Sequence, residues 1–330
     1  MAFSNTYDVT SPGSAVGNRE QLLNVLSVLA PEETPMTSLA KKSKATATFV
    51  EWTVDSLSAP VTAGIAEGAD VSSFTDKFAA RGRIGNYIQK FRRDFKVSDL
   101  QQAVDSVGPA NLAQAEMKAV RELKRDIEAT ICSDNDRAAE DGAGTAYALR
   151  GFGFWINSAG PADVPSAYRT PPSSIHASGL FTEDDLNSLV TSIFRENGMS
   201  NRLTLVADTA LRRLVSGFTR ADTSSNDSTY TVTEPASGKK ITFTVSVYES
   251  DHGIISIINA NPDCMPADVD SGYGRGYLVN PDYLGIAELI PVGSTMLENQ
   301  GGGERGYVDA ACTLIVNHPG AHGKITDITG

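Results

Sequence analysis

Two short segments carry side chains that could do chemistry. Ser250-Asp251-His252 has the residue types of a nucleophilic triad, but adjacent residues cannot converge as a triad does, so we interpret the segment as a turn before Gly253. His318 and His322 are four residues apart, a spacing that would align two metal ligands on a helix. Pro319 lies between them and disfavours that helix, so we expect no metal site.

Two glycine-rich segments could hold a phosphate. They are Gly142-Ala143-Gly144 and Gly272-Tyr273-Gly274-Arg275-Gly276. Neither follows a predicted strand and opens a helix, as a phosphate-binding loop does, so both are predicted to be flexible loops. The sequence therefore predicts no catalytic residue, no cofactor and no enzyme.

A basic stretch over residues 81–96 is the remaining candidate. Tyr87, Phe91 and Phe95 are interleaved with its cations, which are Arg81, Arg83, Lys90, Arg92, Arg93 and Lys96. Cations mixed with aromatic rings are typical of nucleic-acid contact. A solvated strand face, or a surface that pairs with acidic patches on the same protein, is the preferred interpretation.

Composition argues against several classes of protein. The chain has 330 residues, and 40 Asp and Glu against 28 Lys and Arg give a net charge of −12. This balance disfavours a dedicated nucleic-acid binder but not a protein that encloses DNA. No apolar run is long enough to span a bilayer, and the first residues lack a secretory signal. The cysteines (Cys132, Cys264 and Cys312) are far apart and are expected to be free and mostly buried in a reducing compartment.

The elements that would position these residues begin with a polar arm over residues 1–20. Leu22, Leu23, Leu26 and Leu29 then follow helical spacing within residues 19–30. Strand periodicity covers residues 46–54 and 83–97. The soft 25-residue stretch 56–80 between them predicts a long hairpin with a functional loop.

The longest predicted helix covers residues 109–135. Its apolar stripe would face the core, and its charges, including the attractive pair Lys124–Glu128, would face solvent. Residues 147–157 are interpreted as an aromatic strand and 158–179 as an irregular loop. A second helix begins after Thr182 and ends at Gly198. The remaining prediction is a helix over 209–218 and strands over 203–207, 241–249, 253–259, 277–279, 283–290 and 312–316. The mixture lacks regular βαβ alternation, which indicates an α+β fold.

Several of these segments resemble one known family. They include Asn18-Arg19-Glu20, residues 29–35 (LAPEETP), residues 49–52 (FVEW), residues 122–128 (ELKRDIE) and residues 180–186 (LFTEDDL). The pattern resembles the SU-ten-like group of tailed-bacteriophage major capsid proteins over most of the chain. The LAPEETP segment with the following Glu51-Trp52 is the most specific part.

The resemblance implies the Hong Kong ninety-seven (Johnson) capsid fold. Its parts would be an N-terminal arm (1–44), an extended β-hairpin loop (45–97), a peripheral domain with the spine helix (98–175 and 296–330) and an axial domain (176–295). The family-like segment begins by Asn18, so we expect a separate scaffolding protein rather than a removable N-terminal one.

The implied function is a shell subunit. The protein would self-assemble into hexamers and pentamers of an icosahedral head that encloses double-stranded DNA, in the host cytoplasm, with a portal and possibly scaffolding or decoration proteins. The alternative is an encapsulin-like nanocompartment shell that encloses protein. Candidate inter-subunit residues are Arg19, Glu32, Glu33, Trp52, Arg92, Arg93 and Lys96.

Overall fold

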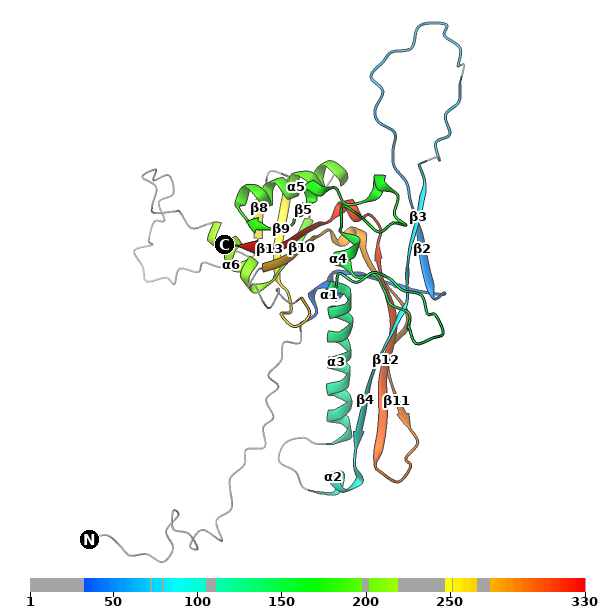
Figure 1. The fold of residues 1–330 in the computed structure, drawn as a ribbon, viewed down its shortest axis with the longest axis vertical. Coiled ribbons are helices and arrows are strands. Elements are labelled where there is room, and N and C mark those ends of the chain that lie inside the picture. Colours follow the sequence, from blue (N-terminus) through cyan, green and yellow to red (C-terminus); the bar gives the residue numbers. More distant parts are fainter. Residues whose placement is uncertain are drawn as a thin grey trace, which may run out of the picture.

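The computed structural model describes residues 33–71, 73–78, 80–104, 111–197, 202–218, 247–250, 252–265 and 274–329. The described part is elongated, with a compact body, a long loop projecting from one end and a helix with long strands extending from the other (Figure 1). Its helices are α1 (Pro35–Leu39), α2 (Asp99–Ala103), α3 (Leu112–Cys132), α4 (Phe152–Trp155), α5 (Glu183–Asn197) and α6 (Thr209–Phe218).

Three sheets contain the strands. A four-stranded sheet has the order β1 (Lys41–Lys44), β11 (Leu284–Leu297), β12 (Glu304–Val316) and β4 (Gln89–Val97). A seven-stranded sheet has the order β5 (Ile175–His176), β13 (Gly323–Thr329), β10 (Gly274–Val279), β7 (Arg202–Ala207), β9 (Gly253–Asn259) and β8 (Val247–Ser250), with β6 (Gly179–Leu180) also on β13. The third pairs β2 (Phe49–Val54) with β3 (Gly82–Tyr87).

The spine helix α3 lies along β4 and β12 and covers one face of the long sheet (Figure 1). The side chain of Asn111 accepts a hydrogen bond from the Gln114 N–H at 3.0 Å and caps the helix. The buried positions Leu123, Ile127 and Ile131 continue the predicted apolar stripe. The helix is a few residues shorter at each end than predicted, because Asn111 and Ser133 have extended backbone.

The two main cores meet at the seven-stranded sheet. Alternate residues of β7 point to opposite faces, so Leu205 packs with α5 and α6, whereas Val206 packs with the core that includes α3. In β10, Leu278 likewise joins the core with α5 and α6, and Tyr277 joins the core that includes α3. One sheet therefore fixes the orientation of α5 and α6 relative to the spine helix.

Three sequence-based assignments are wrong. Residues 147–157 do not form a strand: Phe152 and Trp155, three residues apart, are both fully buried, and the segment contains α4. Gly274 and Gly276 belong to β10 rather than to a loop. A Cβ atom on Gly276 would lie 2.3 Å from Leu211 of α6, so glycine permits this helix to pack closely on the strand. The predicted run over 83–97 is two strands, which separate at the buried Ile88.

The predicted division into domains stays a prediction. Strand β13, within the range predicted to be peripheral, pairs with β10 in the seven-stranded sheet. Strand β11 enters the long sheet at Leu284, within the range predicted to be axial. As secondary structure, α5, α6, β7 and β9 agree with the predicted helices and strands to within one residue. Residues 1–32 and 219–246, which hold the predicted leucine-rich helix and most of the predicted strand over 241–249, lie outside the described residues.

Glu128 was expected on the solvent side of the spine helix, and this is wrong. Its side chain is 1% exposed and accepts hydrogen bonds from the Met36 N–H at 2.7 Å, the Thr37 N–H at 2.9 Å and the Thr37 hydroxyl at 2.5 Å. Burial raises the pKa of Glu128, although these hydrogen bonds act to lower it. The carboxylate thus holds α1 against the middle of α3.

Arg150 is the largest buried charged side chain in the described part of the protein. It is 2% exposed, donates to Asp136 at 2.6 Å and to both oxygens of Asp163 at 3.2 and 2.7 Å, and lies 4.7 Å from the centre of the Trp155 ring. Burial alone would raise the pKa of the Asp163 carboxyl, but the hydrogen bonds and charge of Arg150 and the charge of Arg137 outweigh it and lower that pKa.

The backbone of the same residue binds the hairpin. The Arg150 N–H donates to the side-chain oxygen of Asn86 in β3 at 2.8 Å. The Asn86 amide donates in turn to the carbonyls of Arg150 at 3.2 Å and Leu314 at 3.0 Å. Arg150 thereby connects the loop after α3, the hairpin and β12.

We predict that Arg150→Lys lowers the free energy of unfolding by about 3–5 kcal/mol, because lysine cannot make the bidentate contact and leaves a buried network incomplete. Arg83→Lys is the matched control. Arg83 pairs with Glu51 on the exposed hairpin, where such a pair contributes only about 0–1 kcal/mol. Thermal unfolding of both purified variants under identical conditions measures the difference, and equal losses would contradict the assignment.

Glu128→Ala should lower the free energy of unfolding by about 1–3 kcal/mol, because it leaves the buried Met36 and Thr37 donors unpaired. A raised pKa means that the folded state binds the proton more tightly than the unfolded state. The contribution of Glu128 is therefore greatest below its usual pKa of 4.5 and declines as pH rises through the folded-state pKa. The difference in the free energy of unfolding between the wild type and Glu128→Ala should therefore become smaller as pH rises through the folded-state pKa. Glu122→Ala, on the same helix but half-exposed, should show neither effect.

Candidate functional site

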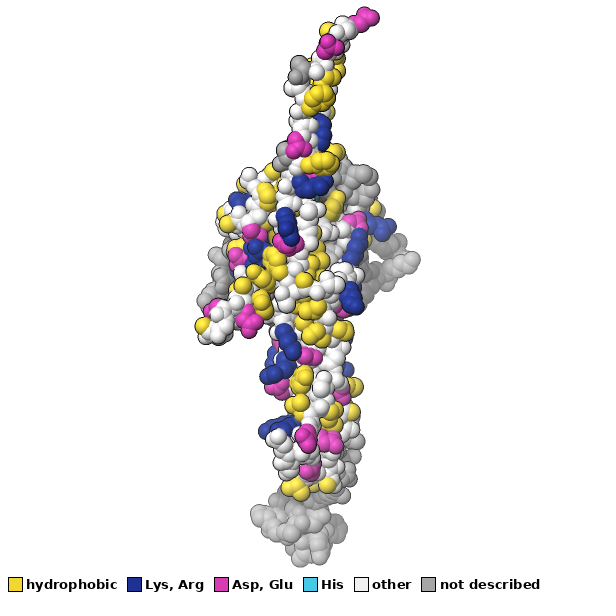
Figure 2. Space-filling model, turned by 90° about the vertical axis from the view of Figure 1, so that its right-hand side faces the viewer, with side chains coloured by type: hydrophobic (Ala, Val, Ile, Leu, Met, Phe, Trp, Pro, Cys, Tyr) yellow, Lys and Arg dark blue, Asp and Glu magenta, His cyan; other side chains and the backbone are white. Residues whose placement is uncertain are grey.

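The loop between β2 and β3 extends away from the body (Figures 1 and 2). Its base is held: the Tyr168 hydroxyl donates to the Ala80 carbonyl, and Arg81 pairs with Asp55 at 3.3 Å. Beyond the base, large apolar side chains are exposed by between 64% and 99%: Leu57, Val61, Ile65, Val71, Phe74 and Phe78. Charged side chains on the loop are also exposed, and three carboxylates (Glu67, Asp70 and Asp76) outnumber one amine (Lys77).

A groove lies at the opposite end of the molecule, on β4 and the hairpin formed by β11 and β12. It has a volume of about 600 Å³ and contains three cations, Arg92, Lys96 and Arg305, and one carboxylate, Asp94. Its apolar lining is made by Phe95, Leu297 and Tyr307. We call it the basic groove.

Two of the predicted contact residues, Arg92 and Lys96, line the basic groove. Arg92 pairs with Asp94 at 3.1 Å and lies 6.0 Å from the centre of the Tyr307 ring. Lys96 lies opposite Arg305 in the register of β4 and β12. Like charges directly opposite each other in a sheet repel, so an anionic group in this groove would be stabilised.

The predicted position of these residues in the hairpin is wrong. The hairpin strand β3 ends at Tyr87, and β4, which carries Arg92, Arg93 and Lys96, pairs with β12 beside the spine helix. The strand signal continued across Ile88 because both strands have buried apolar residues, so the sequence could not reveal the change of sheet.

Arg93 contacts its own subunit. Its guanidinium donates to both oxygens of Asp126 on α3, at 2.5 and 2.7 Å. The hydrogen bonds to Asp126 raise the pKa of Arg93, against a smaller effect of burial. The acidic surface that was expected to meet Arg93 is therefore, at least in part, the spine helix of the same chain.

Trp52 also packs within its own subunit. Its ring lies 5.7 Å from that of Trp155, and its indole N–H donates to the Val316 carbonyl at 3.2 Å. The side chain is half-buried, so part of its surface remains open. Glu33 is exposed, and its carbonyl accepts a hydrogen bond from the Asn261 amide at 2.9 Å. Arg19 and Glu32 lie outside the described residues.

Arg305 and Tyr307 were not among the predicted contact residues, because the last predicted strand began only at residue 312. The alternation of Arg305, Tyr307 and Asp309 with the buried Val308 and Ala310 starts earlier and marks the strand.

Ser250, His252 and His322, which were considered for catalysis or metal binding, contact other residues of the fold. Ser250 pairs with Gly253 across the turn between β8 and β9, and the His252 ring stacks on Phe194 at 4.9 Å. Burial lowers the pKa of His322 to about 3, and its Nδ1 accepts a hydrogen bond from the Asn280 N–H at 3.1 Å.

No group of His, Cys, Asp and Glu that could hold a metal ion occurs among the described residues. All three cysteines are buried and free, as predicted.

Within the described residues, no helix is long and apolar enough to cross a membrane.

Comparison with solved structures finds this fold in capsids. The capsid of an empty GTA particle is 15% identical with a TM-score of 0.62, covering 99% of this chain and 100% of that one. The capsid of cyanophage A-1(L) is 16% identical with a TM-score of 0.61, covering 94% and 97% of the two chains. A structure from Mycobacterium phage Adephagia is 10% identical with a TM-score of 0.60, covering 97% and 99%.

No curated protein sequence matches the chain. The model of one family, described as SU10 major capsid protein, matches residues 4–329. The similar structures named above are phage and GTA capsids, which does not favour the nanocompartment alternative. With a family match over nearly the whole length and an HK97-like fold, the chain belongs to the SU10 major capsid protein family and is a major capsid protein of a tailed phage.

Proposed function

We propose that this capsid protein assembles head to tail into the hexamers and pentamers of an icosahedral shell, through its projecting loop and its basic groove. The observation that supports this most directly is the position of these two surfaces at opposite ends of an elongated molecule (Figure 1). A loop cannot fill the groove of its own subunit, so only a second copy can bring the two together. A head-to-tail contact closes into a ring when the rotation between subunits permits.

The two surfaces are chemically complementary. The loop offers exposed aromatic and aliphatic side chains, such as Phe74, among carboxylates, whereas the groove offers Tyr307 and Leu297 among cations. Apolar burial would supply most of the free energy of association, and the opposite charges would orient the partners. Of the candidate contact residues, Arg92 and Lys96 fit this role best. Trp52 and Arg93 would act indirectly, by fixing the hairpin and β4.

Family membership supports a proposal for the contents and partners of the shell. We propose that it encloses double-stranded DNA without sequence-specific binding, which agrees with the net charge of −12. A portal, and separate scaffolding or decoration proteins, would join it during assembly in the host cytoplasm. The chain would have no catalytic role and need no cofactor.

Hydrogen exchange should distinguish free subunits from shells. Residues 56–71 and 73–78 expose their apolar side chains in the subunit, so their amides should exchange rapidly there. In purified shells a neighbouring groove would cover them, and exchange should slow at least tenfold. The buried strand β7 serves as the internal control and should remain protected in both states. Equal exchange of the loop in the two states would contradict this contact.

Reversing the charge of the groove should impair assembly. Lys96→Glu, and separately Arg92→Glu, should reduce the yield of particles several-fold, with a larger defect at low salt, where repulsion from the acidic loop is screened least. Lys118→Glu makes the same charge change at an exposed position of α3 and should assemble normally. Arg93→Glu should instead lower subunit stability, because it breaks the pair with Asp126. Normal particle yields for both groove variants at every salt concentration would exclude the groove.

A further inference from the structure

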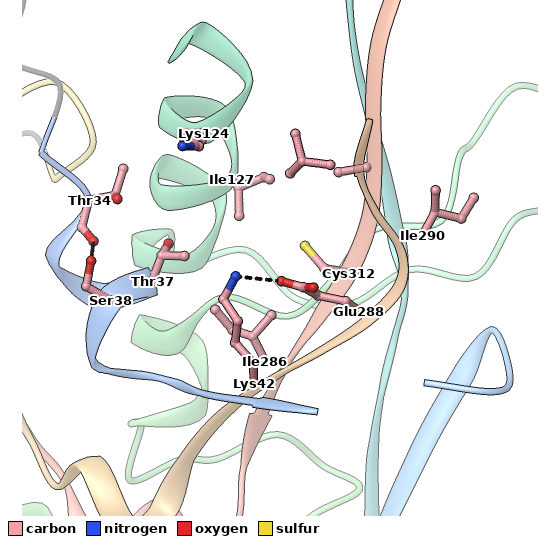
Figure 3. A pocket seen from close by; sticks show the side chains of 12 residues that line it. Thr34, Thr37, Ser38, Lys42, Lys124, Ile127, Ile286, Glu288, Ile290 and Cys312 are labelled. Carbon is pink, nitrogen blue, oxygen red and sulfur yellow. Dashed lines mark hydrogen bonds and ion pairs between the residues drawn. The ribbon is translucent and has the colours of Figure 1, made fainter. Parts of the chain in front are cut away.

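A cavity of about 240 Å³ lies between α1, the spine helix and the two long strands β11 and β12 (Figure 3). The buried side chains of Ile127, Ile286 and Cys312 form its apolar inner wall. On one side Ile290 and Val292 of β11 are 39% and 43% exposed, so apolar surface continues from the cavity to the outside. The polar part of the lining comes from α1, from Lys124 and from the ion pair between Lys42 and Glu288 at 3.0 Å.

The cavity is large enough for apolar side chains. A cavity of roughly 150 Å³ with an apolar lining accommodates a benzene-sized group. The present volume therefore has room for one or two large aliphatic side chains, and its open mouth provides a route for them. An occupant that also covered Ile290 and Val292 would remove exposed apolar surface from water.

The start of the described chain lies at the edge of this cavity. Thr34 lines it, and Glu33 immediately before is held by the hydrogen bond from Asn261. Glu128 fixes Met36 and Thr37 on the other side of Thr34. The described chain therefore begins at a fixed point at the cavity.

The segment nearest that point has the matching chemistry. In the sequence, Leu22, Leu26 and Leu29 share one face at helical spacing, and Asn24 falls on the opposite face. Only residues 31–33 separate this segment from Thr34, and three residues span about 10 Å when extended. Such a short tether gives the segment of the same chain a millimolar effective concentration at the cavity, which favours it over a segment from another copy.

We propose that residues 19–30 bind the cavity of their own subunit as an amphipathic helix, with Leu26 and Leu29 inserted between α1 and β11. This mode of binding places leucines at helical spacing into an apolar groove. The contact would fix the direction in which the N-terminal arm leaves each subunit. It does not depend on the proposed contact between loop and basic groove, since it lies within one chain.

Chemical crosslinking tests the contact in the full-length subunit. We pair Leu26→Cys with Val292→Cys, treat the protein with a short bis-maleimide, and identify the linked peptides by mass spectrometry. The three native cysteines are buried, which favours reaction at the introduced ones. The matched control pairs Asn24→Cys with Val292→Cys. We expect an intrachain link that forms at least fivefold faster for Leu26 than for Asn24. Equal rates, or a link between two chains, would overturn the proposal.

A second pair of variants avoids the introduced cysteines. Leu26→Asp should accelerate hydrogen exchange in α1 and in residues 289–292 by at least threefold, whereas Asn24→Asp should leave it unchanged. Both substitutions lie outside the described body, and the readout does not require shell assembly. Unchanged exchange with Leu26→Asp would show that the leucine face lies elsewhere and would overturn the proposal.

Discussion

The buried guanidinium of Arg150 is the interaction on which the arrangement of the other elements depends. A charge with 2% exposure is tolerated only where its hydrogen bonds are satisfied, and Arg150 meets this condition with Asp136, Asp163 and the face of Trp155. Its partners come from the segments that follow the spine helix, and its backbone binds Asn86 of the hairpin. The direction of the projecting loop is thus set by a polar contact deep in the body. Apolar packing could not specify this direction alone, because it is not directional.

The molecule combines well-packed cores with a loop that buries none of its large apolar side chains. Phe74 is 92% exposed, whereas Phe152 in the body is fully buried. A monomeric protein rarely exposes so many large apolar side chains together, and such surface usually marks an interaction site. In the proposed assembly the loop would gain order from a neighbouring subunit, so its stability would depend on the concentration of subunits. The anchored base, held by Tyr168 and the Arg81–Asp55 pair, reduces the conformational freedom that assembly must remove.

Local sequence patterns predicted the elements well and their partners poorly. The apolar stripe of α3, the acidic first turn of α5 and the alternation of β9 are signals within one segment, and all three elements are present. The change of sheet at Ile88 and the burial of Glu128 depend on residues far along the chain, so no local period could reveal them. The candidate site was predicted only in part for the same reason. Arg92 and Lys96 were identified as a basic patch, but the groove they form requires Arg305 and Tyr307 from a strand more than 200 residues later.

The distribution of charge suggests why association should have one orientation. Two copies that each carry a net charge of −12 repel each other in most relative orientations. This repulsion disfavours incorrect pairing of the subunits. The basic groove is a local exception at one end, and the loop at the other end adds carboxylates to apolar side chains. An end-to-end approach that places the loop on the groove therefore brings opposite charges and apolar surface together. Arg93 differs from Arg92, because its partner Asp126 lies on the spine helix, whereas the partner of Arg92, Asp94, lies in the groove itself. The same strand thus joins the spine helix to the sheet through Arg93, and in the proposed assembly it would present Arg92 and Lys96 to the next subunit.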